Sequence, residues 1–220
     1  MATALVTGAN RGIGFSLAKL LKNRGDTVIA ACRRSTQELT ALGVEVAEGV
    51  DVTSDKSLNI LAEKLKGRSL DVLINNAGLL SHESLQELDF ASIQRQMEVN
   101  AYGPLRVTQK LSGLLKQGSK VALITSRMGS IADNSSGGAY GYRMSKAALN
   151  AAGKSLAHDL ASRGVAVAIL HPGYVKTEMT SNHGNVEPDD AAADLLKRIA
   201  ELTLQNSGTF WHANGQVLPW

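Results

Sequence analysis

The sequence contains very little cysteine and no long apolar run. Cys32 is the only cysteine among 220 residues, so an intrachain disulfide is impossible. A single cysteine favours a reducing compartment, and we expect a cytoplasmic protein. No apolar stretch approaches the ~20 residues that a transmembrane helix needs. The N-terminus also lacks the charged segment and apolar core of a signal peptide, so neither secretion nor a membrane partner is expected.

The chain also lacks a large excess of charge of one sign, because its formal net charge is only +3. Nucleic-acid-binding proteins usually concentrate their basic residues in a stripe, and no such stripe is present. The five histidines, His82, His158, His171, His183 and His212, lack the spacing of metal ligands. No Gly-x-Ser-x-Gly nucleophile elbow occurs, which argues against a serine hydrolase. The sequence therefore predicts no nucleic-acid partner and no metal site, and its mild charge suits a small anionic ligand.

Short apolar runs alternate with helical patterns along the whole chain. Strands are predicted at residues 4–7, 27–31, 44–50, 71–74, 120–125, 165–170 and 209–218. Helices are predicted at residues 15–22, 54–65, 90–117, 142–163 and 188–204, the third of them interrupted by Gly103-Pro104. This alternation predicts an α/β protein with one doubly wound parallel sheet, a Rossmann fold covered by helices on both faces. No shift in composition marks a second domain, so residues 1–220 are expected to form a single domain.

Three glycines follow the first predicted strand in the pattern Thr7-Gly8-x-x-x-Gly12-x-Gly14. Glycines at such a turn let the backbone approach a pyrophosphate, and the following helix supplies free N–H groups. Arg11 adds a positive charge within the turn. The spacing differs from Gly-x-Gly-x-x-Gly and from the Walker pattern, so a purely structural glycine turn remains an alternative to a dinucleotide site at this point.

The end of the second predicted strand indicates which dinucleotide would bind. An NAD site usually carries an acidic residue about 20 positions after the glycine turn, where it bonds the ribose 2′-hydroxyl. Cys32 stands there instead, followed by Arg33 and Arg34. Guanidinium groups hold phosphates in a fork, so the pattern favours NADP(H) over NAD(H). The alternative is that the two arginines only solvate the end of a strand.

Tyr142 and Lys146 stand four positions apart at the start of an alanine-rich helical run. This spacing places the phenol and the ammonium on the same helix face. A free tyrosine titrates near ~10, and a nearby cation favours the phenolate. The pair therefore predicts a tyrosine whose pKa Lys146 lowers toward the range of acid–base catalysis, although the spacing alone also occurs by chance.

Taken in chain order, these motifs resemble the classical members of the short-chain dehydrogenase/reductase family. The resemblance extends over almost the whole chain. Its motifs are Thr7-Gly8-x-x-x-Gly12-x-Gly14, Asp51-Val52, Asn75-Asn76-Ala77-Gly78, Asn100-Ala101-Tyr102-Gly103, Ser126, Tyr142-x-x-x-Lys146 and Pro172-Gly173-Tyr174-Val175-Lys176-Thr177. The C-terminal segment 215–220 is similar to the C-factor and Sniffer-type branch of carbonyl reductases.

The resemblance implies the sheet order 3-2-1-4-5-6-7 and a homodimer formed through two long helices. The polar composition of residues 178–187 predicts a short mobile loop, which is expected to contact the substrate. The resemblance also implies a catalytic tetrad of Asn100, Ser126, Tyr142 and Lys146. Cofactor-binding residues carried over from the family are Gly8, Asn10, Arg11, Gly12, Ile13, Gly14, Arg33, Arg34, Asp51, Val52, Asn76, Ala77, Gly78, Tyr142, Lys146, Pro172, Gly173, Val175 and Thr177.

The same resemblance assigns a role to each member of the tetrad. Tyr142 would donate the proton in carbonyl reduction, and Lys146 would lower its pKa and hold the nicotinamide ribose. Ser126 would stabilise the developing oxyanion, and Asn100 would position a water that relays protons to Lys146. Ser130 is a rival for the serine position, because the separation of 16 residues between Ser126 and Tyr142 is longer than usual in the family. Ser126 is preferred because it matches Ser-x-x-Gly at a strand end.

The sequence therefore predicts an NADPH-dependent carbonyl reductase that transfers hydride to an aldehyde or ketone. Arg127, next to the serine, is a candidate for recognising substrate charge or a solvated side chain. A dinucleotide-binding signalling or sensor protein that retains the fold is an alternative, as is a structural or protein-binding Rossmann module. The sequence does not identify the carbonyl substrate.

Overall fold

The computed structural model describes residues 1–220, and its centre is a sheet of seven parallel strands in the order β3-β2-β1-β4-β5-β6-β7. The strands are β1 (Thr3–Thr7), β2 (Thr27–Cys32), β3 (Glu45–Glu48), β4 (Leu70–Asn75), β5 (Leu115–Ile124), β6 (Ala166–His171) and β7 (Phe210–His212). The order and the parallel arrangement confirm the predicted doubly wound Rossmann fold. No helix combines the length and the apolar character needed to cross a membrane.

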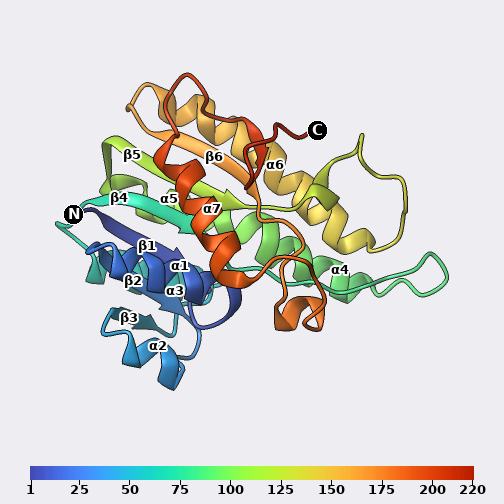
Figure 1. The fold of residues 1–220 in the computed structure, drawn as a ribbon, viewed down its shortest axis with the longest axis horizontal. Coiled ribbons are helices and arrows are strands. Elements are labelled where there is room, and N and C mark those ends of the chain that lie inside the picture. The colour runs from blue at the N-terminus through green and yellow to red at the C-terminus, as the bar shows by residue number, and fades with distance from the viewer.

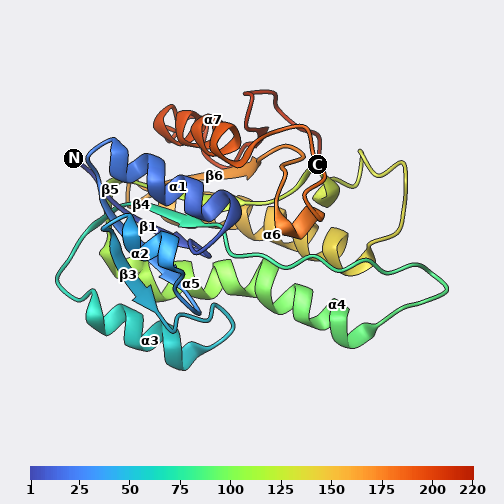
Figure 2. The same cartoon turned by 60° about the horizontal axis from the view of Figure 1, so that its bottom comes forward.

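Helices cover both faces of this sheet, as Figures 1 and 2 show. The helices are α1 (Gly12–Asn23), α2 (Gln37–Ala41), α3 (Asp55–Lys64), α4 (Phe90–Met97), α5 (Gly103–Leu111), α6 (Tyr140–Ala161) and α7 (Pro188–Ala200). In Figure 2, α1 and α7 form the layer above the sheet, and α3, α4 and α5 lie below it. Short 3₁₀ segments occur at 112–114, 127–129 and 178–180.

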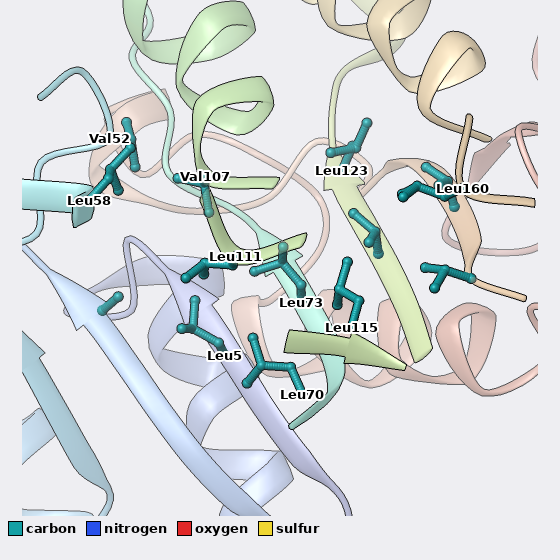
Figure 3. Packing of buried hydrophobic residues seen from close by; sticks show 14 of the residues in the cluster. Leu5, Val52, Leu58, Leu70, Leu73, Val107, Leu111, Leu115, Leu123 and Leu160 are labelled. Atoms are coloured by element: carbon teal, nitrogen blue, oxygen red, sulfur yellow. The ribbon is translucent and has the colours of Figure 1, made fainter. Parts of the chain in front are cut away.

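Alternate residues of the central strands pack into two separate hydrophobic cores. Leu5 and Leu73 face the layer of α3, α5 and α6, where they pack with Val107 and Leu111 (Figure 3). Their neighbour Val6 faces the opposite core, which α1 and α7 cover. Strands buried on both faces are the expected result of a parallel sheet between two helical layers. The near-continuous apolar runs of the sequence therefore have a direct structural cause.

The structure differs from the predicted elements in several places, and the strand predicted at 209–218 is only the three residues of β7. Residues 90–117 do not form one interrupted helix, because a π-helical turn at Glu98–Tyr102 separates α4 from α5 and β5 already begins at Leu115. Helix α2 was not predicted, although Thr36 caps its first turn by accepting a hydrogen bond from the Leu39 N–H at 3.2 Å. Ser54 caps α3 in the predicted way.

The strand order reverses direction between β1 and β4, which are hydrogen-bonded neighbours. In doubly wound sheets, ligands bind beyond the carboxyl ends of the strands at this reversal. The glycine turn after β1 and the Asn-Asn-Ala-Gly segment after β4 both lie there. The fold thus brings together the motifs that sequence analysis found far apart.

Candidate active site

The glycine turn after β1 leaves no room for side chains. Gly8 has φ of +66°, and a Cβ atom there would lie 2.9 Å from the Cα of Ala77. A Cβ on Gly14 would lie 2.9 Å from the carbonyl carbon of Gly8 and would also contact the Asn76 amide. Glycine is therefore required at both positions, and the N-terminus of α1 stays open to a ligand.

Thr7 and Asn76 join the ends of β1 and β4. The Thr7 hydroxyl accepts hydrogen bonds from the Asn76 N–H at 3.0 Å and the Ala77 N–H at 3.1 Å. The Asn76 side chain donates in return to the carbonyl oxygens of Thr7 at 3.0 Å and Gly8 at 3.2 Å. These bonds fix the floor of the crevice in which a dinucleotide is expected.

Arg33 and Arg34 lie just beyond β2 and are exposed. Neither guanidinium has an ion-pair partner or a side-chain hydrogen bond within the chain. The buried Cys32 stands at the position of the acidic residue of an NAD site, and the nearby Glu48 carboxylate on β3 accepts a hydrogen bond from the Ser35 N–H at 3.0 Å. Asp51 accepts bonds from the Thr53 N–H at 2.9 Å and hydroxyl at 2.8 Å, which fixes the turn beside the expected adenine position. The residues present therefore fit a 2′-phosphorylated dinucleotide.

Three of the predicted catalytic side chains lie together in the interior. Tyr142, Ser126 and Lys146 are exposed by only 9%, 8% and 4%. The Ser126 hydroxyl accepts a hydrogen bond from the Met128 N–H at 3.1 Å and lies near enough to the Tyr142 phenol to lower its pKa. The Lys146 ammonium lies 5.7 Å from the centre of the Tyr142 ring and donates to the Ile124 carbonyl at 2.9 Å. The first turns of α6 and the end of β5 together form this cluster.

Burial shifts the two titrating groups in opposite directions. It raises the pKa of Tyr142, an effect that the nearby Ser126 hydroxyl partly opposes. It lowers the pKa of Lys146 to about 8. The expected lowering of the Tyr142 pKa by Lys146 is therefore not found in the structure, because desolvation of the phenolate outweighs other effects and the ammonium is bonded to a backbone carbonyl instead.

Ser130 is occupied elsewhere and does not approach the tyrosine as a hydrogen-bond partner. Its hydroxyl donates to the main-chain oxygen of Trp220 at 3.1 Å and accepts from the Asp133 N–H at 3.1 Å. Ser126, at the N-terminal end of the 3₁₀ segment Arg127–Gly129, is the serine beside Tyr142. The geometry thus favours the serine that the Ser-x-x-Gly motif indicated.

Asn100 lies inside the π-helical turn, and its side chain is fully buried. Its carboxamide accepts from the Leu79 N–H at 2.7 Å and donates to the Leu79 carbonyl at 2.7 Å and the Ser145 hydroxyl at 3.0 Å. All of these bonds are made to protein groups, so the second lone pair of Oδ1 and the backbone are the groups of Asn100 left for a water. Gly78 is adjacent, since a Cβ there would lie 3.5 Å from the Asn100 Oδ1 and 3.8 Å from the Lys146 Nζ.

The segment after β6 closes over the glycine turn. A Cβ on Gly12 would lie 3.3 Å from the Thr177 Cγ2, and Arg11 forms an ion pair with Glu178. Val175 is buried and pairs with Val186 in an isolated bridge. The expected polar loop 178–187 thus contains a 3₁₀ turn, Glu178–Thr180, and is bonded to Arg11 in the glycine turn and to Val175 in the segment after β6.

Sequence reasoning missed two clusters near these residues. Glu83 is a buried carboxylate at the start of α6, within a loop that has no recognisable motif. His171 and His212 pack edge to face with their ring centres 5.0 Å apart. Burial, His212, Arg127 and Lys146 together lower the pKa of His171 to about 3. The position of His171 at a strand end before Pro172 suggested only that it could face the cleft, and its pairing with His212 gave no sequence signal. The two histidines are 41 positions apart, and only the pairing of β6 with β7 brings them together.

Comparison with known proteins agrees with this geometry. A family model described as short chain dehydrogenase matches residues 2–187. The chain is 45% identical over 226 residues to the 1-hydroxy-2-glutathionyl-2-methyl-3-butene dehydrogenase of Rhodococcus sp. (strain AD45), covering 100% of both chains. It is 44% identical over 154 residues to the C-signal protein of Myxococcus xanthus, covering 69% of this chain and 93% of that protein.

Two solved structures are similar over the full length. An NADPH-bound carbonyl reductase from chicken fatty liver has a TM-score of 0.91 and 29% identity, covering 100% of this chain and 99% of that chain. The carbonyl reductase Sniffer of D. melanogaster has a TM-score of 0.93 and 27% identity, covering 100% of both. These similarities confirm the resemblance to the C-factor and Sniffer-type branch. The chain belongs to the short-chain dehydrogenase/reductase family of oxidoreductases.

Proposed function

We propose that this protein is an NADPH-dependent carbonyl reductase that acts on an aldehyde or ketone. The observation that carries the proposal is the buried Tyr142 phenol, which lies beside the Ser126 hydroxyl and close to the Lys146 ammonium. A proton donor, a hydrogen-bond donor for the oxyanion and a cation thus lie together where a carbonyl oxygen would gain negative charge. The NADPH-bound state of a similar carbonyl reductase supports the choice of cofactor.

The cofactor would lie across the crevice at the ends of β1 and β4. The first turn of α1 would receive the pyrophosphate, and Arg33 and Arg34 would bind the 2′-phosphate. Asp51 and Val52 would bracket the adenine, Gly78 would lie beneath the nicotinamide ribose, and Val175 and Thr177 would hold the carboxamide. Residues Asn10, Ile13, Pro172 and Gly173 complete the expected contacts. Bound NADPH supplies the hydride.

The protonation states of the tetrad suit the reduction. A raised pKa keeps the Tyr142 phenol protonated at neutral pH, which is the form that donates a proton. Ser126 would donate a hydrogen bond to the carbonyl oxygen as it becomes an oxyanion. Lys146, with a pKa of about 8, is mainly cationic at neutral pH and would stabilise the phenolate that remains after the proton transfer. Asn100 holds the backbone of Leu79 and the helix of Tyr142 in place.

Tyr142→Phe tests the proposal. We expect wild-type protein to oxidise NADPH with at least one member of a panel of aldehydes, ketones and quinones. The variant should lose about a hundredfold to ten-thousandfold in kcat, which is the usual contribution of a general acid. Its affinity for NADPH, followed by nicotinamide fluorescence, should be retained. Tyr140→Phe, two positions away on the same helix, is the matched control, and equal losses in both variants would contradict the proposal.

A dinucleotide-binding signalling protein is the alternative function, and the similarity to the C-signal protein is the observation that favours it. The two functions make different predictions for the same variant. If Tyr142→Phe abolished turnover and left the cellular function of the protein intact, signalling would be its purpose. Loss of both would assign the cellular function to catalysis.

A second candidate reaction is oxidation of an alcohol that carries a glutathionyl group, as the name of the Rhodococcus relative states for that enzyme. Glutathione carries two carboxylates, and Arg127 places a half-exposed guanidinium directly after Ser126. Arg127 is ion-paired with Asp133 at 2.7 Å, so its charge is partly neutralised. The candidate predicts turnover of a glutathionyl alcohol with NADP⁺ or NAD⁺ that Arg127→Met weakens more than turnover of a neutral alcohol.

A homodimer is a further part of the proposal. A groove of about 570 Å³ runs over the outer surface of α5 and α6, and Tyr102 and Leu105 are exposed along it. An exposed groove with apolar rims on α5 and α6 suits packing against a second copy. Light scattering of the purified protein would give the mass that decides between monomer and dimer.

A further inference from the structure

Two polar crosslinks attach the helix of Tyr142 to the helix that runs beside it. Gln96 and Asn100 stand four positions apart on α4 and the π-helical turn, and Gly141 and Ser145 stand four positions apart on α6. Asn100 bonds Ser145 directly at 3.0 Å. Gln96 reaches Gly141 through a third residue, Glu83, which comes from the loop between β4 and α4.

Glu83 is the centre of the second crosslink. Its carboxylate accepts hydrogen bonds from the Gln96 amide at 2.6 Å, the Ser92 hydroxyl at 3.2 Å and the Gly141 N–H at 3.1 Å. Its backbone carbonyl also accepts from the Ala139 N–H at 2.8 Å. The side chain is only 5% exposed, and every partner is a donor, which an ionised carboxylate satisfies. In Figure 2 the loop that carries Glu83 runs between α4 and α6.

Close packing at the start of α6 leaves no space for this helix to move toward α4. Gly141 packs so closely on α4 that a Cβ there would contact the Gln96 amide and lie 3.0 Å from the Ile93 Cα. Ala139, the residue before α6, adopts a left-handed conformation with φ of 45°. A non-glycine residue adopts this conformation at a cost, so it persists only where its surroundings hold it. The bond from its N–H to the Glu83 backbone is one such constraint.

Tyr142 lies between the two crosslinks, one residue after Gly141 and three before Ser145. Ser145 also donates to the carbonyl of Tyr142 at 2.8 Å. We propose that Glu83 is a positioning residue for the Tyr142 phenol, acting through the Gly141 N–H and Gln96 rather than by touching substrate or cofactor. The inference rests on the proposed function of Tyr142 as proton donor, and it adds a residue that no family motif contains.

Glu83→Gln is the informative variant, because it keeps the size of the side chain and creates an unavoidable conflict. The new amide must point its NH₂ either at the Gly141 N–H or at the Gln96 NH₂. Turning Gln96 over would relieve that contact only by facing its own NH₂ toward the Ser81 N–H, which now donates to the Gln96 Oε1 at 3.0 Å. One donor therefore opposes another donor in every arrangement of the single variant.

The double variant Glu83→Gln/Gln96→Glu restores the match between donors and acceptors. The carboxylate introduced at position 96 would accept from the Ser81 N–H and from the new amide at position 83, whose oxygen would accept from the Gly141 N–H. Glu87→Gln, on an exposed glutamate of the same loop, is the control for loss of a charge. All variants would be assayed for kcat with the best carbonyl substrate, for NADPH affinity by fluorescence, and for amide hydrogen exchange over residues 139–146.

We expect Glu83→Gln to lower kcat about tenfold to a hundredfold, since a small displacement of a catalytic group has effects of this size. NADPH affinity should be unchanged, exchange at 139–146 should be faster, and the double variant should recover both kcat and protection.

Equal losses of turnover and NADPH affinity would show a general role in folding and would overturn the inference, as would a Glu83→Gln variant that behaves like Glu87→Gln. If the wild type turned over no carbonyl compound, the proposed function would fail, and unchanged exchange at 139–146 would separately reject the role of Glu83.

Discussion

Tyr142 and Lys146 are both buried at the start of α6, and desolvation moves each of them toward its neutral form. For the tyrosine this means a proton that is available at neutral pH. For the lysine it means an ammonium that loses its proton more readily than it would in water. The sequence predicted the pair from its spacing, and it predicted the wrong direction for the tyrosine pKa, because a sequence pattern shows which charges are close but not how far water is excluded.

Ser126 and Glu83 show what sequence patterns can identify at the scale of single residues. Ser126 was recognisable because it ends a strand and begins Ser-x-x-Gly, and the structure shows it beside Tyr142. Glu83 was not recognisable, because its three partners come from α4 and from a helix that begins 57 positions later. A carboxylate in a polar loop is usually solvated, and only the fold reveals that this one is buried.

Arg33 provides the residue-scale prediction on cofactor choice. Arg33→Ala should raise the Michaelis constant for NADPH far more than that for NADH, because only NADPH carries the 2′-phosphate that this guanidinium would bind. A charge-assisted hydrogen bond is worth about 1.5–3 kcal/mol, which corresponds to roughly a tenfold to hundredfold change. Steady-state kinetics with both cofactors measure the effect. Arg24→Ala, which removes an arginine near the amino ends of the strands, serves as the control, and equal effects of Arg33→Ala on both cofactors would disprove the assignment.

At the scale of elements, the π-helical turn Glu98–Tyr102 is the feature that positions Asn100. A π turn within an α-helix frequently marks a functional site. Apolar periodicity could not predict it, since one added residue per turn changes the pattern too little. The early start of β5 could not be predicted for a different reason. Residues 116–119 are polar and lack a strand pattern, and the pairing with β4 shifts its register between Leu70 and Val72.

Gly129 sets the distance between the end of β5 and helix α6. A Cβ there would lie 2.6 Å from the Lys146 carbonyl carbon and 2.9 Å from the Ala147 nitrogen, and neither backbone atom can move without the helix. We expect Gly129→Ala to destabilise the protein by about 1–3 kcal/mol, the usual cost of overpacking. It should also lower kcat, because Ser126 and Tyr142 are carried by the two elements that it would separate.

Urea unfolding and steady-state kinetics test this prediction together. Gly113→Ala is the matched control, since a Cβ on Gly113 would meet no atom within 4 Å. The close packing at Gly129 would be irrelevant to the site if Gly129→Ala retained both the stability and the turnover of Gly113→Ala.

At the scale of the whole molecule, the sheet order and the two-layer covering could be predicted from the alternation of patterns and from the family resemblance. The two cores follow from apolar strands whose residues alternate between faces. Contacts between distant strand ends could not be predicted in the same way. The His171–His212 pair depends on the register between β6 and β7. Because β7 has only three residues, the sequence pattern is too short to predict that register.

This histidine pair predicts how the global stability depends on pH. Burial, His212, Arg127 and Lys146 lower the folded-state pKa of His171 to about 3 from an ordinary value of 6.5. Between these values the unfolded chain binds more protons than the folded one, so stability falls as the pH falls from about 6.5 toward 3. One such group costs about 2 kcal/mol between pH 7 and pH 5.

Urea unfolding at pH 7 and pH 5 measures this loss. His171→Gln removes the titrating group and should lose less stability over the same interval than the wild type, by about the amount that His171 contributes. His183→Gln, at an exposed histidine of the 178–187 loop, is the control. A wild type and a His171→Gln variant with the same dependence on pH would show that His171 is not buried in its neutral form.

The central claim is that a nicotinamide hydride and the Tyr142 proton reach the same carbonyl group. The most direct measurement uses NADPH deuterated at the transferable position of the nicotinamide, a carbonyl substrate from the panel, and mass spectrometry of the product. We predict an alcohol that carries one deuterium at the former carbonyl carbon when the wild type is present, and essentially none with Tyr142→Phe over the same time. Tight binding of NADPH by the wild type without any transfer of deuterium to a carbonyl compound would contradict the account.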